Sequence, residues 1–290
     1  MNKKTFTPYF FIGPHLILFF IFFLIPAIFG IYISFTRWNL IGTPTFVGFE
    51  NYREILFNTD STFHRQFMEG MSNTFIFAIL TVPFCIIFPL MFASSLNTKP
   101  KGMKFFQSIF YLPTLFSISA VMIIWSMMFS RAFGPVNRIF DLDTNWLGAQ
   151  PYAWIALVIV TVWWVIGGNM IIYQAALSGV PKDYYEAASL DGANSIQKFF
   201  YITLPSIKSQ ILYTLVMTTI AQLNVIGQPM MLTNGGPNGS TFVLLMYIND
   251  LAFGGGGISI AGIASAMAVM LGLAIMAVST VQFIVLRKNN

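Results

Sequence analysis

Residues 180–205 read VPKDYYEAASLDGANSIQKFFYITLP, a polar stretch with five charged side chains between two long hydrophobic segments. We call this stretch the polar loop. Connections between helices usually need only about two to eight residues, so a segment of this length is expected to have structure of its own. Pro181 suits the first position of a helix, Asp183 and Glu186 suit its first turn, and Gly192 suits a reversal of the chain.

The second half of the polar loop predicts another short helix. Ser195 is expected to cap its N-terminus, and Ile196, Phe199 and Phe200 then follow with helical spacing until Pro205. The polar loop is therefore predicted to form a helix-turn-helix that presents small residues and a few charges to another molecule.

The rest of the chain is too hydrophobic to form a water-exposed surface. Of its 290 residues, 56% are hydrophobic and 9% are charged, and the mean hydropathy is +0.72, whereas soluble domains carry about 25% charged residues. About 20 consecutive apolar residues span a bilayer as a helix. We predict an all-α integral membrane protein with one transmembrane domain over residues 1–290 and no cleavable signal peptide. Six spans are expected, at about 11–35, 73–96, 105–130, 152–173, 209–228 and 260–286.

The basic residues are distributed unevenly between the two sides of this arrangement. One side carries both termini, the connection after the second span and the polar loop; its ten basic and three acidic residues give a net charge of +7. The other side has five basic and seven acidic residues, a net charge of −2. Cytoplasmic segments carry the excess of Lys and Arg, so both termini and the polar loop are predicted to be cytoplasmic. The overall charge of +5 then reflects topology, and no nucleic acid partner is expected.

Several kinds of chemistry are missing from the sequence. The Gly235–Gly236 pair lacks the Lys-Ser/Thr of a phosphate-binding loop, and His15, His64 and the single Cys85 do not make up a metal-ligand set. The predicted spans contain no Asp, Glu, Lys or Arg, so transport coupled through buried titratable groups is not expected. We therefore predict no catalytic residue, no metal and no cofactor bound by this chain. Another molecule would supply the energy for uphill transport, and it would act on this chain at the polar loop.

The fourth and fifth predicted spans carry neutral polar residues. Asn169 is one of those in the fourth span. Gln222 and Asn224 in the fifth are unfavourable in lipid and should face protein or water. These polar residues either join helices by hydrogen bonds or line a path for an uncharged, hydroxyl-rich solute, beside a tryptophan able to stack on a sugar ring; both interpretations stay open at this point. Gly167 and Gly168 predict a close approach between helices.

The polar loop also carries a family signature: Glu-Ala-Ala, three residues, Gly, nine residues, Ile, one residue, Leu-Pro. It resembles the signature loop of the membrane subunits of bacterial binding-protein-dependent ABC importers. The segments FVGFENY at 46–52 and LTNGGP at 232–237 are similar to the sugar-importer branch. Within that branch, the chain resembles the family of the first membrane subunit of the maltose permease, without that subunit's extra N-terminal helices and large external insert.

The resemblance implies an importer permease fold of type I and a division of labour among subunits. The polar loop would act as a coupling helix-turn-helix that docks on a cytoplasmic ATPase dimer, which binds ATP and Mg. A second permease subunit would complete the pore, and an extracytoplasmic solute-binding protein would deliver a sugar. The implied coupling residues are Glu186, Ala187, Ala188, Asp191, Gly192, Leu204 and Pro205. Without this resemblance, Glu186 would be an ordinary acid near a helix N-terminus.

The helices before and after the signature line the sugar path in the maltose permease. The matching residues here are Thr161, Trp164, Val165, Gly168, Thr218, Gln222 and Val225, with Asn224 beside them. Two other classes of function stay open. One is a stand-alone secondary transporter or facilitator. The other is a membrane enzyme acting on a lipid-linked sugar, for which Asp141 and Asp143 are the only acid pair that comes into question.

Overall fold

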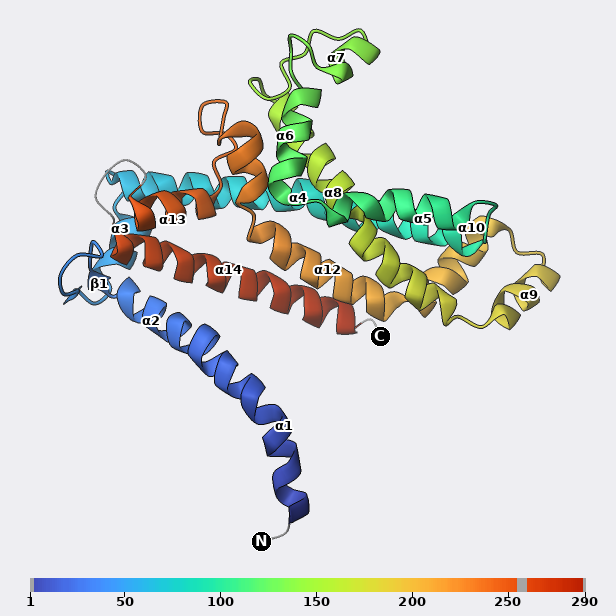
Figure 1. The fold of residues 1–290 in the computed structure, drawn as a ribbon, viewed down its shortest axis with the longest axis horizontal. Coiled ribbons are helices and arrows are strands. Elements are labelled where there is room, and N and C mark those ends of the chain that lie inside the picture. Colours follow the sequence, from blue (N-terminus) through green and yellow to red (C-terminus); the bar gives the residue numbers. More distant parts are fainter. Residues whose placement is uncertain (1–2, 255–259, 289–290) are drawn as a thin grey trace. The chain divides into compact units, whose positions relative to one another are not determined.

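In the computed structural model the chain forms helices joined by short loops, with a small antiparallel strand pair near the N-terminal end (Figure 1). The structure describes residues 3–254 and 260–288. The chain divides into two compact units, Met1–Gly70 with Leu244–Ala274, and Met71–Val243 with Ile275–Asn290. The mostly helical fold predicted from the sequence is confirmed.

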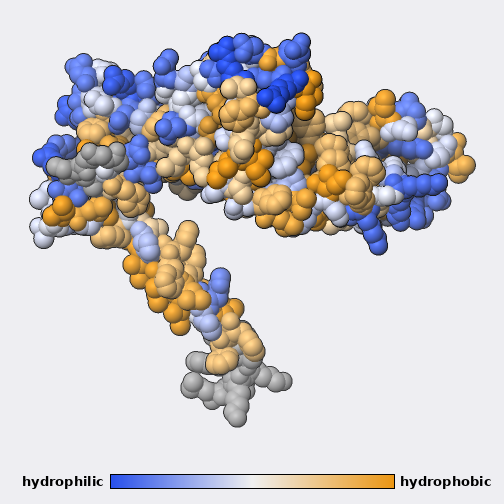
Figure 2. Space-filling model, turned by 45° about the horizontal axis from the view of Figure 1, so that its top comes forward, coloured by the Kyte–Doolittle hydropathy of each residue, from blue (hydrophilic) through white to orange (hydrophobic). Residues whose placement is uncertain are grey.

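The first unit holds the N-terminal helices and the strand pair. Its elements are α1 (Lys3–Phe19), the π-helical turn η1 (Phe20–Leu24), α2 (Ile25–Ser34), β1 (Thr36–Arg37), β2 (Thr45–Phe46), α3 (Glu50–Phe57), the start of α4 (Thr62–Asn97), α13 (Leu244–Phe253) and the start of α14 (Ala261–Lys288). The strands pair with Thr36 opposite Phe46. The π-helical turn ends two residues before Pro26, which cannot donate a backbone hydrogen bond to that turn. Hydrophobic side chains cover the surface of α2 (Figure 2).

The second unit holds the remaining elements. They are the rest of α4, α5 (Met103–Tyr111), the 3-10 turn η2 (Leu112–Leu115), α6 (Ile118–Met128), α7 (Pro135–Ile139), α8 (Tyr152–Ser178), α9 (Lys182–Leu190), α10 (Ser195–Lys198), the π-helical turn η3 (Phe199–Thr203), α11 (Leu204–Ser206), α12 (Lys208–Leu223), the π-helical turn η4 (Pro229–Thr233) and the end of α14.

The core of the second unit lies where α4 and α8 pack together. Ala93 on α4 and Met170 and Tyr173 on α8 are fully buried in one cluster. A small residue such as Ala93 lets two helices approach closely, which is the main source of packing energy in lipid. The hydroxyl groups of Tyr173 and Thr214 are hydrogen-bonded at 2.5 Å, which ties α8 to α12.

Four of the predicted spans lie in long apolar helices. The helices that are long and apolar enough to cross a membrane are Phe10–Ser34, Thr62–Asn97, Tyr152–Ser178 and Ala261–Val285. Within the described residues these four candidates become five if the bent pair α5–η2 and α6 is counted as one span. Several apolar helices are therefore present, as predicted.

The third predicted span, 105–130, is broken in its middle. The segments Met103–Leu115 and Ile118–Met128 meet at 103°. Pro113 is the second residue of the tight turn η2. Ser117, in extended conformation, then starts a new helix by accepting a hydrogen bond from the Ala120 N–H on its side-chain oxygen at 3.3 Å. A proline followed by an N-cap residue stops one helix and starts the next.

The fifth predicted span, 209–228, corresponds to α12 and the segment after it. α12 has 16 residues, about 24 Å of helix at a rise of 1.5 Å per residue, which is shorter than the hydrocarbon core of about 30 Å. The helix ends at Leu223 with Asn224 as its C-cap, and residues 225–226 are not helical before the chain becomes helical again at 227.

Candidate functional site

The first half of the polar loop folds as a helix followed by a tight turn. α9 begins at Lys182, one residue later than predicted, so Pro181 is its N-cap and not its first helical residue. Asp183 is the acid in its first turn. Glu186 lies in the second turn, so its predicted place in the first turn is wrong. Gly192 has φ +76°, a conformation that favours glycine, and makes the predicted reversal.

The second half begins with an N-cap that the sequence reading missed. Asn194 accepts a hydrogen bond from the Gln197 N–H at 2.9 Å, and the Gln197 side chain accepts one from the Asn194 N–H at 2.8 Å. Ser195 is the first helical residue, so its predicted capping role is wrong. Asn with Gln three residues later satisfies two free backbone donors at once, a signal that is visible in the sequence. The helix-turn-helix conformation of the polar loop is confirmed.

The surface of α9 is exposed. Glu186, Ala187, Asp191 and Gly192 are exposed and Ala188 is half-buried. Leu190, next to them, is 90% exposed. Figure 2 shows hydrophilic residues gathered at the end of the second unit where α9 and α10 lie. The first five predicted coupling residues thus lie together at α9 and its turn.

The last two predicted coupling residues lie elsewhere in the loop. Leu204 is half-buried and packs on the α4–α8 cluster, while Pro205 is exposed. Leu204 thereby attaches the loop to the core, and the π-helical turn η3 precedes Pro205 as η1 precedes Pro26.

The predicted path residues on α8 share one helix face. Thr161, Trp164, Val165 and Gly168 follow at helical spacing, and all except the buried Thr161 are half-buried. The Thr161 hydroxyl is buried and has no hydrogen-bond partner among the described residues. Trp164 donates from Nε1 to the Phe116 carbonyl at 3.1 Å, which fixes its ring beside the break between η2 and α6.

The predicted path residues of the fifth span are mostly buried within the chain. Thr218, Gln222 and Val225 are buried. Asn224 is exposed, and it donates to the carbonyl of Ile220 at 2.8 Å. This bond caps the end of α12. α8 and α12 pack against each other in the second unit (Figure 1), so the structure brings the two predicted sets onto neighbouring helices.

A hydrogen-bonded junction joins three helices beside this path. The Asn169 side chain on α8 donates to the Cys85 carbonyl on α4 at 2.9 Å and to the Thr218 hydroxyl on α12 at 3.1 Å. The Cys85 carbonyl would normally accept from residue 89 of its own helix, but Pro89 has no N–H. Asn169 therefore replaces a missing helical donor. Of the two interpretations left open for this residue, hydrogen bonding between helices holds.

The adjacent glycines of α8 have different surroundings. A Cβ on Gly167 would lie 2.7 Å from the Tyr111 Cα and 2.8 Å from the Phe110 carbonyl, so only glycine fits against α5. A Cβ on Gly168 would meet no atom within 4 Å. The predicted close approach is confirmed at Gly167 and wrong at Gly168, which faces open space on the same face as the predicted path residues.

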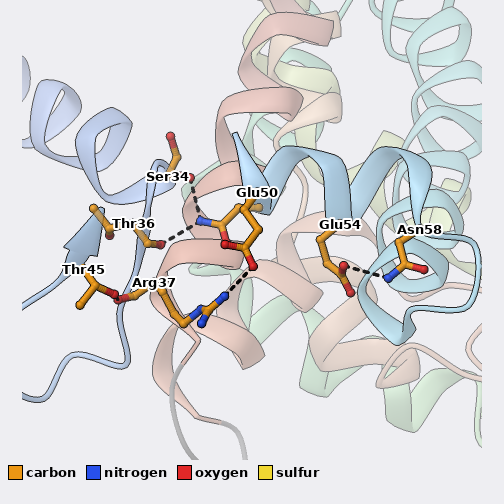
Figure 3. A network of polar contacts seen from close by, with 8 residues as sticks. Ser34, Thr36, Arg37, Thr45, Glu50, Glu54 and Asn58 are labelled. Atoms are coloured by element: carbon orange, nitrogen blue, oxygen red, sulfur yellow. Dashed lines mark hydrogen bonds and ion pairs between the residues drawn. The ribbon is translucent and has the colours of Figure 1, made fainter. Parts of the chain in front are cut away.

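The FVGFENY segment of the first unit organises a polar network after α2 (Figure 3). Asn51 is buried and donates to the carbonyls of Ser34 and Thr36, both at 2.8 Å. Arg37 pairs with Glu50 at 2.5 Å on the surface. The Asn satisfies the free carbonyls after the last turn of α2, which gives the segment a structural role.

A pocket of about 670 Å³ lies beside this network. Trp38, Asn39 and Glu54 are among its lining residues. Asn58 donates to the Glu54 carboxylate at 2.9 Å, and this bond lowers the pKa of Glu54. Within residues 3–254 and 260–288, no group of three or more His, Cys, Asp or Glu side chains is placed to hold a metal ion.

The acid pair considered for an enzyme does not form a site. Asp143 accepts two hydrogen bonds from Arg131, from Nε at 2.8 Å and from Nη2 at 2.7 Å, and this contact lowers the pKa of Asp143. Both side chains are mainly exposed. Asp141 has φ +52° and is exposed in the same loop. The pair belongs to a solvated loop.

Comparisons with known proteins agree with the signature in the polar loop. Residues 59–289 match the family described as binding-protein-dependent transport system inner membrane component. The arabinooligosaccharides transport system permease protein AraP of Halalkalibacterium halodurans is 32% identical, with coverage of 87% of this chain and 82% of AraP. The multiple sugar-binding transport system permease protein MsmF of Streptococcus mutans is also 32% identical, with coverage of 92% and 90%.

A solved structure has the same fold. It is a bacterial alginate ABC transporter in complex with an alginate pentasaccharide-bound periplasmic protein; its matching chain is 25% identical, with a TM-score of 0.81 and coverage of 97% of this chain and 93% of that chain. The predicted family is confirmed, and its members are transport subunits rather than enzymes. The chain belongs to the family of inner membrane components of binding-protein-dependent transport systems.

Proposed function

We propose that the chain is the permease subunit of an ATP-driven importer of a carbohydrate, an oligosaccharide in particular. The observation that carries this proposal is the polar loop, where the importer signature lies on an exposed helix-turn-helix. The carbohydrate follows from the relatives, whose names refer to arabinooligosaccharides and multiple sugars. It also fits the predicted spans, which hold no charged side chain to bind an ionic solute.

In this proposal α9 is the coupling helix that docks on a cytoplasmic ATPase dimer. Glu186 supplies the charged contact, Ala187 and Ala188 permit close approach, and Gly192 makes the turn that exposes the helix. Asp191 ends the helix beside them. Leu190, 90% exposed, would lose its contact with water on docking, as apolar side chains at the centre of an interface do. Leu204 holds the loop on the α4–α8 core, and the exposed Pro205 follows it.

The solute path runs along the exposed face of α8 and the neighbouring end of α12. Gly168 leaves open space there, and Trp164 offers a ring for stacking against a sugar. Val165 lies on the same face as Trp164 and Gly168. The buried Thr161 hydroxyl, without a partner among the described residues, is available to a sugar hydroxyl group.

The fifth span contributes the other wall of this path. Thr218, Gln222 and Val225 would line it, and Asn224 lies at its end. The buried side chains would become accessible to the solute when a second permease subunit and this one move against each other.

The whole chain acts as one permease domain with six spans in this proposal. The excess of Lys and Arg on one side supports a topology with both termini and the polar loop in the cytoplasm of a bacterial cell. A second permease completes the pore, an extracytoplasmic solute-binding protein delivers the sugar, and the ATPase subunits bind ATP and Mg.

Energy coupling tests this proposal. Uptake of labelled neutral oligosaccharides is measured in cells that carry the complete transporter, and again after removal of the ATPase subunit. We expect uptake to vanish without the ATPase and to survive a protonophore while ATP is maintained. Uptake that persists without any ATPase subunit would contradict the proposal and favour a secondary transporter or facilitator.

A further inference from the structure

A pocket of about 620 Å³ lies between the ends of α4 and α8 and the polar loop. We call it the lysine pocket, because Lys99, Lys182 and Lys198 line it together with several serine and threonine hydroxyl groups, and no Asp or Glu is among its lining residues. The acids of the polar loop, Asp183, Glu186 and Asp191, are exposed and do not line it.

The lysine pocket has free hydrogen-bond donors. The ammonium groups of Lys99 and Lys182 have no hydrogen bond or ion pair with any residue in the described part of the chain. Lys198 donates to the Ser189 hydroxyl at 2.7 Å, which leaves two of its three N–H groups. The Ser94 hydroxyl is buried at the pocket and is also without a partner among the described residues. A ligand with several anionic oxygens would satisfy these groups.

A second concave surface lies earlier along the same two helices. It has a volume of about 520 Å³ and an almost wholly apolar lining that includes Phe84, Phe88 and Phe92 of α4 and Ile159 and Ile166 of α8. We call it the phenylalanine groove. Its lining side chains are of the kind that acyl chains contact in a membrane.

The lysine pocket and the phenylalanine groove share a face of α4. On α4, Ser95 of the pocket follows Phe88 and Phe92 of the groove by seven and three residues, which is helical spacing. On α8, Leu177 of the pocket follows Ile166 of the groove by eleven residues, but Met170 and Tyr173 between them are buried, whereas Phe88 and Ser95 of α4 are exposed. Eleven residues are about three helical turns and about 16 Å, close to half of the hydrocarbon thickness of about 30 Å.

We propose that the lysine pocket and the phenylalanine groove form one binding site for a phospholipid with an anionic headgroup. The lysines bind the headgroup phosphate, and an acyl chain lies along the groove. This placement rests on the proposed topology, which puts the polar loop at the cytoplasmic face of the membrane, where basic pockets between helices bind anionic headgroups. Because the lysines come from the connection after α4, from α9 and from α10, the lipid holds the polar loop against the helix ends.

Lipid retention by the purified full chain tests this proposal. Native mass spectrometry measures the retention of phosphatidylglycerol against phosphatidylcholine for Lys99→Gln/Lys182→Gln and for the matched control Lys101→Gln/Lys104→Gln, which removes two nearby charges outside the pocket. We expect about thirtyfold weaker binding of phosphatidylglycerol in the pocket variant, from two lost lysine–headgroup attractions, and binding close to that of the unmodified chain in the control. Equal retention by the two variants would overturn the proposal.

Two further arms separate the possible ligands. Phe88→Ala should weaken retention of long-chain phosphatidylglycerol and leave a short-chain analogue unaffected, whereas Phe105→Ala, outside the groove, should change neither. Displacement of the long-chain lipid by millimolar inorganic phosphate would instead identify a free-anion site and overturn the lipid proposal. A pocket variant that keeps its lipid and loses the ATPase subunit would also overturn it, because the lysines would then belong to a protein interface.

Discussion

Asn169→Leu tests the reasoning about the helix junction, because it removes both hydrogen bonds of this side chain and keeps a similar volume. Of the two acceptors, Thr218 can turn its hydroxyl to another partner. The Cys85 carbonyl has no such alternative, since Pro89 cannot donate to it. The substitution therefore leaves one buried backbone carbonyl without a donor.

The expected loss in the free energy of unfolding follows from these two contacts. A buried carbonyl without a donor costs about 1–3 kcal/mol, and a side-chain hydrogen bond between helices in a membrane is worth about 0.6 kcal/mol. We expect a total loss of about 2–4 kcal/mol. Thr218→Val removes only the side-chain bond and should cost about 0.6 kcal/mol.

Reversible unfolding of the full chain in mixed micelles, by titration with a denaturing detergent, measures these losses. The decisive variant is Pro89→Ala, which restores an N–H four residues after Cys85. Pro89→Ala should change the free energy of unfolding more favourably in Asn169→Leu than in the unmodified chain, by about 1–2 kcal/mol. Asn224→Leu is the matched control, because among the described residues the Asn224 side chain bonds only to Ile220 of the helix that it caps. Equal costs of Asn169→Leu with and without Pro89 would refute the reasoning.

Two further predictions concern a loop and a helix contact. Arg131 lowers the pKa of Asp143, so the ion pair should order its loop above the ordinary pKa of about 3.9 and release the loop as the pH falls through the lowered pKa. A spin label at position 141 should gain mobility over that fall in pH. Unchanged mobility of the label in Asp143→Asn at neutral pH would contradict this. Gly167→Ala should lower the free energy of unfolding by about 1–3 kcal/mol through overpacking against Tyr111, whereas Gly168→Ala, in open space, should not lower it. Equal effects of the two substitutions would contradict the assigned contacts.

The parts of the fold that the sequence predicts depend on patterns within one segment. The apolar runs predicted the long helices α4, α8 and α14 because a membrane-spanning helix satisfies its own backbone hydrogen bonds. The helix-turn-helix of the polar loop was predictable from Pro181 and Gly192, because helix caps and turns depend on residues that are close together in the sequence. The N-cap was misassigned because Ser195 and Asn194 are both good caps, and only Gln197 distinguishes them.

The helix breaks and the junction depend on partners that are distant in sequence. Mean hydropathy over 105–130 does not register one proline, although Pro113 lies in the tight turn that breaks the helix there. Asn169 and Cys85 are 84 residues apart, so no periodicity within one helix reveals their bond. Gly167 and Gly168 are identical in sequence, and only the position of α5 separates their roles.

The central claim is that α9 couples this chain to an ATPase, and association with that subunit tests it most directly. The full chain, carrying an affinity tag, is purified from cells that express all subunits of the transporter, and the copurified ATPase is quantified. The test variant is Glu186→Lys. The control is Asp141→Lys, which makes an equal charge change in an exposed loop on the opposite side of the membrane in the proposed topology. We expect the unmodified chain and Asp141→Lys to retain the ATPase and Glu186→Lys to lose it while still inserting in the membrane. Full retention by Glu186→Lys would contradict the account.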